Sequence, residues 1–306
     1  MPTMMQIFAE ELLKAGRNDP NIVALSADVP NSTGLKLFAE TFPDRYFETG
    51  ICEQNMIGAA AGMALAGKKA VASSYACFSP GRTWEQIRNA VCLDNADVKI
   101  VGAHIGVGSG RNGATHQSFE DIALMTCLPN MKVYSPATER DTRLCAREML
   151  DTTGPAYIRL SAELCPVSED YHCDLSHPAP LKYGTDFAVI GTGGILRKAL
   201  RAIETLDLSR HSRIAVFNLV RLDALNADIL APLKSFKAVL CLEEHQINGG
   251  LASLIAPFFA ESKDFPPLYR MGVELRFGAS MDPEDLYAHL NLSEQDVLNR
   301  LTKIVT

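Results

Sequence analysis

The chain has 306 residues, of which 47% are hydrophobic, and it carries 29 basic against 36 acidic residues, a formal net charge of -7. This composition excludes a disordered chain and predicts a globular protein long enough for two domains of ordinary size. The negative charge comes without any block of like charges, so we expect neither a nucleic acid nor an anionic membrane as a partner. A small anionic substrate would have to be bound by local basic residues.

The cysteines and the N-terminus indicate the cellular compartment. Eight cysteines lie mostly within apolar runs, and no CxxC pair occurs, which is typical of buried, reduced thiols. The N-terminal stretch MPTMMQIFAEELLKAG has acidic residues where a signal peptide needs an apolar core. No apolar run approaches the roughly 20 residues of a membrane-spanning helix. We therefore expect a cytoplasmic protein.

Short β-branched runs alternate with helical patterns along the first half of the chain. Strands are predicted at residues 21–28, 69–76, 98–105, 131–137 and 156–161, and helices at 53–67 and from about residues 83, 120 and 139. Alternation of this kind predicts a parallel sheet with helices on both faces.

A second alternating series follows a proline-containing stretch. Residues 166–182 carry three prolines, scattered charges and no periodicity, which predicts a linker. Beyond it, strands are predicted at 186–194, 213–220, 237–245 and 267–273, with helices from about 196, near 227 and from about 251. We therefore predict an α/β protein with two three-layer, parallel-sheet domains, residues 1–165 and 183–306.

Several polar and aromatic residues stand at or near the ends of the predicted strands. In open α/β sheets, ligands gather at the carboxyl ends of the strands. The residues at such positions are Asp28, Glu53, Tyr75, Phe78, His104 and Arg159. Each alone has a structural explanation, such as a helix cap or a core side chain, but their shared placement favours a binding site.

Two stretches raise more specific questions. Glu53 opens a helix so rich in Gly, Ala and Met that it is expected to be buried, and a buried carboxylate needs a partner, for which a ligand is a candidate. The segment GVGSGRNGATHQ, residues 106–117, places four glycines ahead of His116. Its backbone N–H groups could cradle an anion, and a mobile surface loop is the alternative.

Four motifs together resemble the transketolase family of thiamine-diphosphate enzymes. They are GICEQNMIGAAAGMALAG, SSYACFSPGRTWEQIRNAV, GATHQSFEDIALMTCLPNMKVYSPA and GPAYIRLS, and they cover most of residues 20–165. Weaker markers, VLCLEEH and NGGL, occur in the second half. The resemblance implies a pyrimidine-binding domain followed by the family's C-terminal domain.

The resemblance implies roles in cofactor binding and catalysis. Glu53 matches the family's glutamate that hydrogen-bonds N1′ of the aminopyrimidine ring and promotes the tautomer that deprotonates the thiazolium carbon. Tyr75 and Phe78 match aromatic residues that pack on the pyrimidine, and Ile51 matches another apolar wall. Glu53, His104 and His116 are the implied catalytic residues.

The resemblance also implies a sugar site, with departures from the family pattern. The implied substrate-binding residues are Ser32, His104, Arg111, Asn112, His116 and Arg159, with Ser32, His104 and Arg159 near a terminal phosphate. Gln6 stands where the family often has an arginine, Asn112 replaces an aspartate, Arg111 is added, and a third pyrimidine-facing aromatic falls at about Gly81. A branched ketose phosphate or a sulfonate is therefore left open beside the usual phosphosugars.

The chain lacks the family's GDG motif with its later asparagine pair, which binds Mg²⁺ and the diphosphate. The resemblance therefore implies the C-terminal subunit of a split transketolase, active only with an N-terminal partner subunit in an α2β2 heterotetramer. Such an enzyme transfers a two-carbon ketol unit from a ketose to an aldose. The alternatives are a β subunit of a 2-oxo acid dehydrogenase, half of a deoxyxylulose-phosphate synthase, and a catalytically silent relative that only binds a partner.

Overall fold

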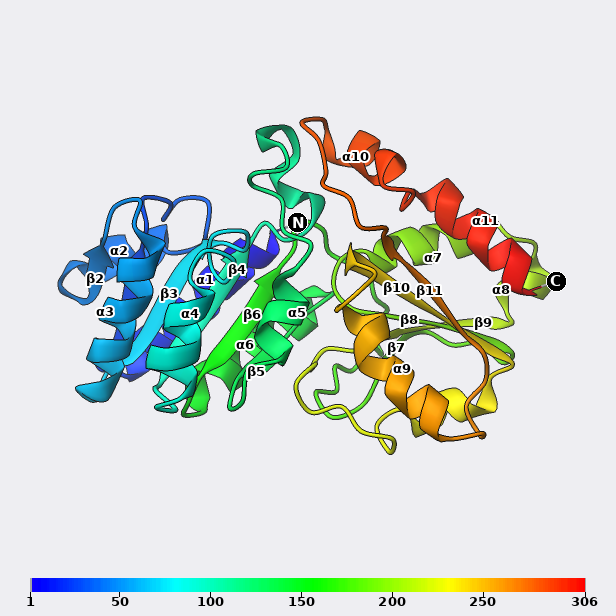
Figure 1. The fold of residues 1–306 in the computed structure, drawn as a ribbon, viewed down its shortest axis with the longest axis horizontal. Helices are drawn as coiled ribbons and strands as arrows, with labels where there is room; N and C mark the ends of the chain where they lie inside the picture. Colours follow the sequence, from blue (N-terminus) through cyan, green and yellow to red (C-terminus); the bar gives the residue numbers. More distant parts are fainter. Residues whose placement is uncertain (1, 306) are drawn as a thin grey trace.

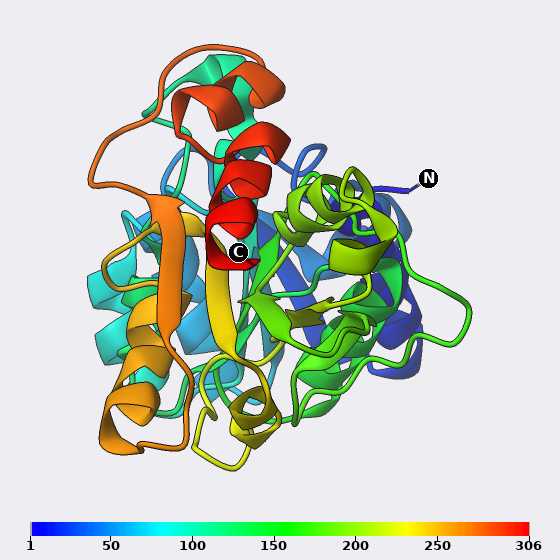
Figure 2. The ribbon, with the colours of Figure 1, turned by 90° about the vertical axis from the view of Figure 1, so that its right-hand side faces the viewer.

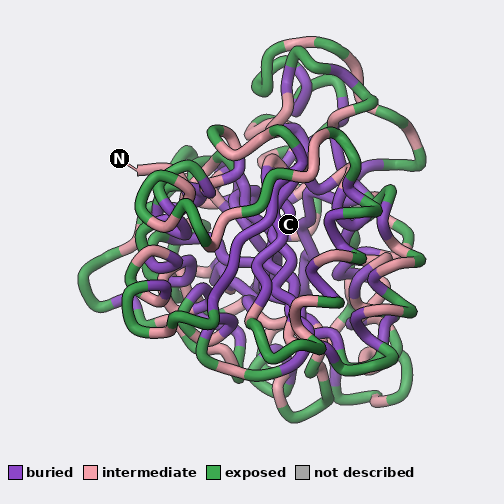
Figure 3. Tube along the Cα trace, turned by 90° about the vertical axis from the view of Figure 1, so that its left-hand side faces the viewer, coloured by how far each residue is buried: buried purple, intermediate pink, exposed green. Residues whose placement is uncertain are grey.

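Two α/β domains lie side by side in the computed structural model, which describes residues 2–305 (Figure 1). The first domain contains a six-stranded sheet and the second a five-stranded sheet. Buried segments fill the centre of the molecule, and exposed segments lie mostly around its periphery (Figure 3). The prediction of two α/β domains is confirmed.

The first sheet is entirely parallel. Its strands are β1 (Ile22–Ser26), β2 (Tyr46–Glu48), β3 (Lys69–Tyr75), β4 (Val98–Ala103), β5 (Lys132–Tyr134) and β6 (Ala156–Leu160). Their order is β2-β1-β3-β4-β6-β5, and Tyr75 pairs with Ala103 in the register of β3 and β4. The carboxyl ends of the strands therefore meet at one edge, where a binding site was predicted.

Helices cover both faces of this sheet. They are α1 (Met4–Asn18), α2 (Lys36–Thr41), α3 (Glu53–Leu65), α4 (Trp84–Gln86), α5 (Asp121–Thr126) and α6 (Glu139–Asp151), with 3-10 turns at Pro43–Arg45 and Val107–Asn112. One apolar core joins α1 and α6 to the sheet, and a second joins α3 to the opposite face. The helix predicted from residue 83 is present, but its second part, Ile87–Cys92, is a π-helix.

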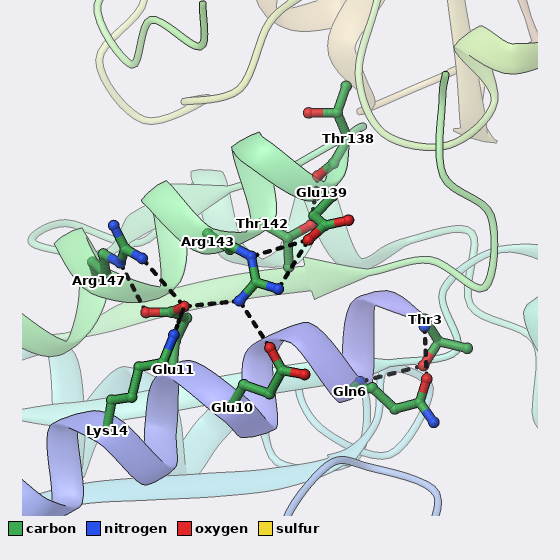
Figure 4. Close-up of polar contacts among 10 residues, drawn as sticks. All are labelled: Thr3, Gln6, Glu10, Glu11, Lys14, Thr138, Glu139, Thr142, Arg143 and Arg147. Atoms are coloured by element: carbon green, nitrogen blue, oxygen red, sulfur yellow. Dashed lines mark hydrogen bonds and ion pairs between the residues drawn. The ribbon is translucent and has the colours of Figure 1, made fainter. Parts of the chain in front are cut away.

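A buried carboxylate joins α1 to α6 (Figure 4). Glu11 is 3% exposed and accepts hydrogen bonds from Lys14 at 2.8 Å, Arg143 at 2.9 Å and Arg147 at 2.8 Å. Burial alone would raise the pKa of Glu11, but the hydrogen bonds from Arg147, Lys14 and Arg143 lower it to about 2. Glu11 is therefore ionised near neutral pH and stabilises the packing of the two helices.

The second sheet is parallel except at one edge. Its strands are β7 (Ala179–Lys182), β8 (Phe187–Gly191), β9 (Ile214–Asn218), β10 (Ala238–Gln246) and β11 (Leu268–Val273), in the order β11-β10-β8-β9-β7. The exception is β7, which pairs antiparallel with β9 and lies inside the stretch predicted as a linker. An edge position accommodates Pro180, which has no N–H to donate.

Helices also flank the second sheet (Figure 2). They are α7 (Leu196–Glu204), α8 (Leu208–His211), α9 (Leu251–Glu261), α10 (Pro283–His289) and α11 (Glu294–Val305). The α-helix predicted near residue 227 is wrong, since the structure has turns there and then a short 3-10 helix at Ala231–Ser235. Pro232 removes one backbone donor from that segment.

The two domains share an apolar core. Ile122 and Met125 of α5 belong to the same buried cluster as Leu219, Leu222 and Leu251 of the second domain. The backbone N–H of Ser135 donates to the carbonyl of Val220 at 2.7 Å across the same boundary. The C-terminal domain is therefore packed firmly against the first sheet. Within residues 2–305, no helix is long and apolar enough to cross a membrane.

Candidate active site at the edge of the first sheet

Several residues predicted for the site lie at the carboxyl edge of the first sheet. Tyr75 is the last residue of β3, and His104 directly follows β4. Asp28 follows β1 and has a φ of 63°, and His104 has a φ of 54°. A left-handed backbone is uncommon for residues other than glycine, so the surrounding structure must hold both turns in place.

Aromatic side chains bring together residues that are far apart in the sequence. The ring of Tyr75 lies edge-on to His104 with centroids 4.8 Å apart, and 6.1 Å from the ring of Phe78. Phe78 in turn lies edge-on to His116 at 5.2 Å. The loop 106–117 therefore places His116 against the same aromatic pair that contacts His104, as a shared site requires.

His104 is held in one tautomer by the segment that follows β1. Its Nε2 lies 2.9 Å from the carbonyl oxygen of Ser32. A carbonyl oxygen only accepts hydrogen bonds, so Nε2 carries the proton and donates. Burial lowers the pKa of His104, and the ring is therefore neutral at neutral pH.

Glu53 is buried at the first turn of α3 and has a partner within the chain. Its side chain is 2% exposed, and its Oε2 accepts a hydrogen bond from Nη1 of Arg82 at 2.7 Å. The guanidinium of Arg82 also lies over the ring of Phe78, 4.6 Å from its centroid. Arg82 therefore links Glu53 to the aromatic cluster. Among residues 2–305, no hydrogen-bond donor reaches the other oxygen, Oε1.

Two departures from the family pattern have local structural explanations. A Cβ at Gly81 would lie 2.2 Å from the carbonyl oxygen of Cys77, so no aromatic side chain fits at this position without a shift of the backbone. Gln6 caps α1, because its side chain accepts from the N–H of Thr3 at 2.8 Å while Thr3 accepts from the N–H of Gln6. Gln6 is thus part of a capping box (Figure 4).

Arg159, which was predicted to bind substrate, forms a buried ion pair in the structure. Its guanidinium is fully buried and donates from Nε and Nη2 to the two carboxylate oxygens of Asp121, at 2.6 and 3.1 Å. Burial alone would raise the pKa of Asp121, but the charge of Arg159 holds it below its ordinary value. Tyr157 donates to the same carboxylate at 2.8 Å. Arg159 is therefore engaged in a structural ion pair, and its contact with substrate stays a prediction.

Three further predicted residues lie outside the aromatic cluster. Arg111 is 78% exposed and forms a two-pronged ion pair with Asp282 of the C-terminal domain, with both N···O distances 2.8 Å. Asn112, its neighbour, is exposed at the end of the 3-10 segment. Ile51 is 75% exposed just ahead of α3. A substrate anion would have to compete with Asp282 for Arg111.

The sequence reasoning missed Arg82 as a site residue and Glu244 as an interface residue. Both stood within quoted motifs, Arg82 in the PGRTWE segment and Glu244 in VLCLEEH. Two adjacent glutamates inside an otherwise apolar strand were the signal for the second, since buried carboxylates require partners. No pattern in the sequence indicated that Arg82 reaches Glu53.

The comparisons with known proteins identify the family. Residues 1–167 match the pyrimidine binding domain of transketolase, and residues 179–297 match the transketolase C-terminal domain. The chain belongs to the transketolase family. It is 34% identical over 302 residues to a putative transketolase C-terminal section from Methanocaldococcus jannaschii, with 97% of this chain and 95% of that protein covered.

Other members of the family are similarly related. The chain is 31% identical to one of the subunits of an apulose-4-phosphate transketolase from Actinobacillus succinogenes, covering 88% of each. It is 32% identical to a subunit of a 6-deoxy-6-sulfo-D-fructose transketolase from Clostridium sp. (strain MSTE9), covering 89% of this chain and 84% of that one. A solved structure described as a split-gene transketolase in an inactive β4 tetramer superposes with a TM-score of 0.87 at 34% identity, covering 100% of this chain and 99% of that one.

The residues present fit the pyrimidine half of thiamine diphosphate, the cofactor on which this family depends. Glu53 offers the free oxygen Oε1 from a buried carboxylate, and Tyr75 and Phe78 offer aromatic surface that Arg82 links to this carboxylate. Within residues 2–305, no group of three His, Cys, Asp or Glu side chains is arranged to hold a metal ion. The prediction of the transketolase family is confirmed, and so is the fold class of both domains.

Proposed function

We propose that this chain is the C-terminal subunit of a split transketolase, which transfers a two-carbon ketol unit from a ketose to an aldose. The observation that carries the proposal is the buried Glu53 with its free Oε1, linked through Arg82 and Phe78 to His116. Tyr75, next to Phe78, extends this cluster to His104. Near end-to-end similarity to a protein named as a transketolase C-terminal section supports the same conclusion. These relatives favour a transketolase over a β subunit of a 2-oxo acid dehydrogenase.

The chain requires a partner under this proposal. We assign the Mg²⁺ ion and the diphosphate of the cofactor to an N-terminal subunit, since the sequence here lacks the motif that would bind them. A relative whose solved structure is described as an inactive β4 tetramer supports the need for that subunit. We propose an α2β2 heterotetramer as the assembly. The cytoplasm is our proposed location, because eight cysteines occur without a CxxC pair.

The chain's own residues would bind and orient the cofactor and the sugar and polarise the reacting groups. Bound thiamine diphosphate would supply an electron sink for cleavage of the carbon–carbon bond. Oε1 of Glu53 would accept a hydrogen bond from the pyrimidine ring in a site of low dielectric, where such a bond is strengthened. His104 is fixed by Ser32, and His116 packs on Phe78. Nδ1 of His104 would accept a hydrogen bond from a sugar hydroxyl, and Nε2 of His116 would hydrogen-bond the sugar or the reacting oxygen.

The end group of the substrate is proposed to be anionic. Arg111 and Asn112 lie on the loop that carries His116, and an arginine binds a phosphate or a sulfonate through two parallel hydrogen bonds. Two relatives carry names that mention a branched sugar phosphate and a sulfo sugar. Either end group would have to replace Asp282 as the partner of Arg111.

Substitution of the buried carboxylate tests the proposal. Glu53→Gln keeps an acceptor for Arg82 but not the charge, so the chain should fold and assemble while turnover falls by at least about 100-fold, as expected for a lost acid–base group. The assay is ketol transfer by the complex with the co-purified N-terminal subunit, on a panel of ketose phosphates and 6-deoxy-6-sulfo-D-fructose.

The control is Glu85→Gln, the same change at an exposed glutamate whose side chain accepts hydrogen bonds from Gln86 and Asn89. It should leave turnover within about twofold of the parent protein, because surface substitutions of this kind have small effects. Near-normal turnover by Glu53→Gln would contradict the role of Glu53. A parent complex that binds no thiamine diphosphate would instead favour a catalytically silent relative.

A further inference from the structure

The loop 106–117 contains no regular structure apart from the 3-10 segment Val107–Asn112 and a bridge between Gly106 and Ser118. Gly106, Gly110 and Gly113 have positive φ values of 57°, 46° and 80°, and the 3-10 segment is interrupted at Gly110. Glycine-rich backbone loses more conformational freedom on ordering than other backbone, so external contacts must stabilise one shape. The shape matters for the proposed function because Arg111, Asn112 and His116 lie on this loop.

A carboxylate of the C-terminal domain fills the first turn of the loop. Oε1 of Glu244, at the end region of β10, accepts a hydrogen bond from the backbone N–H of Val107 at 2.7 Å. A Cβ at Gly106 would lie 2.0 Å from that same oxygen. Because Gly106 has no side chain, the carboxylate of Glu244 can lie in this space, and a side chain at position 106 would collide with it.

The rest of the loop contacts the C-terminal domain in the same manner. Nε2 of Gln117 donates to the carbonyl oxygens of Gly110, at 3.0 Å, and Ala279, at 2.9 Å, so one amide joins the loop to the segment before α10. A Cβ at Gly278 would lie 1.9 Å from the side chain of Gln117. Ser280 donates to the carbonyl of Arg111. In Figure 1 the loop rises between the two domains, beside the orange segment that leads into α10.

Glu244 is buried, and its environment makes it sensitive to substitution. No hydrogen bond of good geometry reaches its second oxygen, Oε2, although Tyr287 lies close enough to interact with the carboxylate. Burial raises the pKa of Glu244 to about 7. The amide of a Glu244→Gln variant therefore resembles the protonated form of Glu244, which is populated near neutral pH.

We propose that the C-terminal domain is the template on which the loop 106–117 takes its shape, with Glu244 as the positioning residue for Arg111 and His116. Ser109 connects the first turn of the loop to its end, since its hydroxyl donates a hydrogen bond to the carbonyl of His116 at 2.6 Å. The link to substrate binding rests on the proposed function. The link to loop shape does not.

The experiment compares Glu244→Ala, Glu244→Gln and Glu243→Ala. Glu243 is the matched control because it is equally buried on the same strand, and burial raises its pKa to about 7 as well, but it accepts from Leu251 and Ala252 at the start of α9. Hydrogen exchange of the Val107 amide is measured in the full chain, with and without its partner subunit. Donor KM and kcat are measured in the complex.

Glu244→Ala should speed exchange at Val107 by about 10- to 100-fold, the effect of losing one bond to a charged acceptor. Glu244→Gln should restore most of the protection, because its carbonyl oxygen still accepts. Glu243→Ala should lower thermal stability without changing exchange in residues 106–117. In the complex, Glu244→Ala should raise the donor KM more than it lowers kcat. Glu243→Ala should not raise the donor KM more than it lowers kcat.

Equal exchange at Val107 in Glu244→Ala and Glu243→Ala would overturn the proposal, and so would a loop opened as much by Glu244→Gln as by Glu244→Ala. Faster exchange with an unchanged donor KM would overturn the link between the loop and the substrate. If the parent complex transferred no ketol unit at all, the proposed function would fail, while the exchange measurements would still decide whether Glu244 shapes the loop.

Discussion

Replacing Arg159 by alanine should destabilise the protein rather than weaken substrate binding. The substitution leaves the carboxylate of Asp121 buried without its ion-pair partner, and Nε and Nη2 of Arg159 are its two charged donors, at 2.6 and 3.1 Å. Removing one member of a fully buried pair costs about 3–5 kcal/mol. With an unfolding entropy of about 2.1 cal/mol/K per residue and 306 residues unfolding together, the Tm should fall by about 5–8 °C.

The assay is thermal unfolding followed by circular dichroism, together with donor KM in the complex at a temperature where the variant stays folded. A double variant, Arg159→Met with Asp121→Leu, removes both charges and should recover much of the lost stability. Recovery should be incomplete, since the hydroxyl of Tyr157 also loses its acceptor. An unchanged Tm with a raised KM for anionic donors only would refute this reasoning and support a direct contact of Arg159 with the substrate.

Glu11→Gln should lower the free energy of unfolding by about 1–2 kcal/mol at neutral pH. This is less than the shift of the pKa of Glu11 from 4.5 to about 2 implies, because its partners Lys14 and Arg147 are half exposed. Since the folded pKa is depressed, the stabilisation is present above about pH 4.5 and is lost as the pH falls toward 2, so urea denaturation of parent and variant should converge there. The control is Glu10→Gln, at an exposed partner of Arg143, which should change the free energy of unfolding by no more than about 0.5 kcal/mol. A loss of stability in Glu11→Gln that stays constant with pH would contradict the charge argument. Asp282→Ala should release Arg111 with little change in stability, because the pair is exposed, and should lower the KM for donors with a terminal anion. An unchanged KM would remove Arg111 from the substrate site.

The sequence predicted most of the architecture because most strands, such as β1, β4 and β6, are short, buried apolar runs between helical patterns. It missed β2 at Tyr46–Glu48, a three-residue strand with no fully buried side chain. It mispredicted segments whose structure depends on tertiary contacts. Residues 179–182 read as a linker, since Pro180 and nearby charges hide an edge strand that forms only against β9. Near residue 227 a helix was expected, but the chain forms turns and a 3-10 helix at Ala231–Ser235, which contains Pro232.

The candidate site was predicted in part for a similar reason. Position along the strands indicates which residues reach the sheet edge, and Tyr75, Phe78 and His104 do meet there with His116, which was predicted from the glycine-rich loop. Position does not indicate which way a side chain points. Arg159 stands near such an edge yet turns into the protein to pair with Asp121, a residue 38 positions away. The contact of Arg82 with Glu53 likewise depends on how the turn after β3 is folded.

The most direct test of the central claim is the composition of the complex that this chain forms in its native cell. The chain is tagged and isolated, its partner is identified by mass spectrometry, the mass of the assembly is determined, and bound thiamine diphosphate is quantified. We expect an N-terminal transketolase subunit in equal amount and about one thiamine diphosphate per pair of subunits. A chain isolated without such a subunit and without thiamine diphosphate would contradict the split-transketolase function, and Glu53 would then need another explanation.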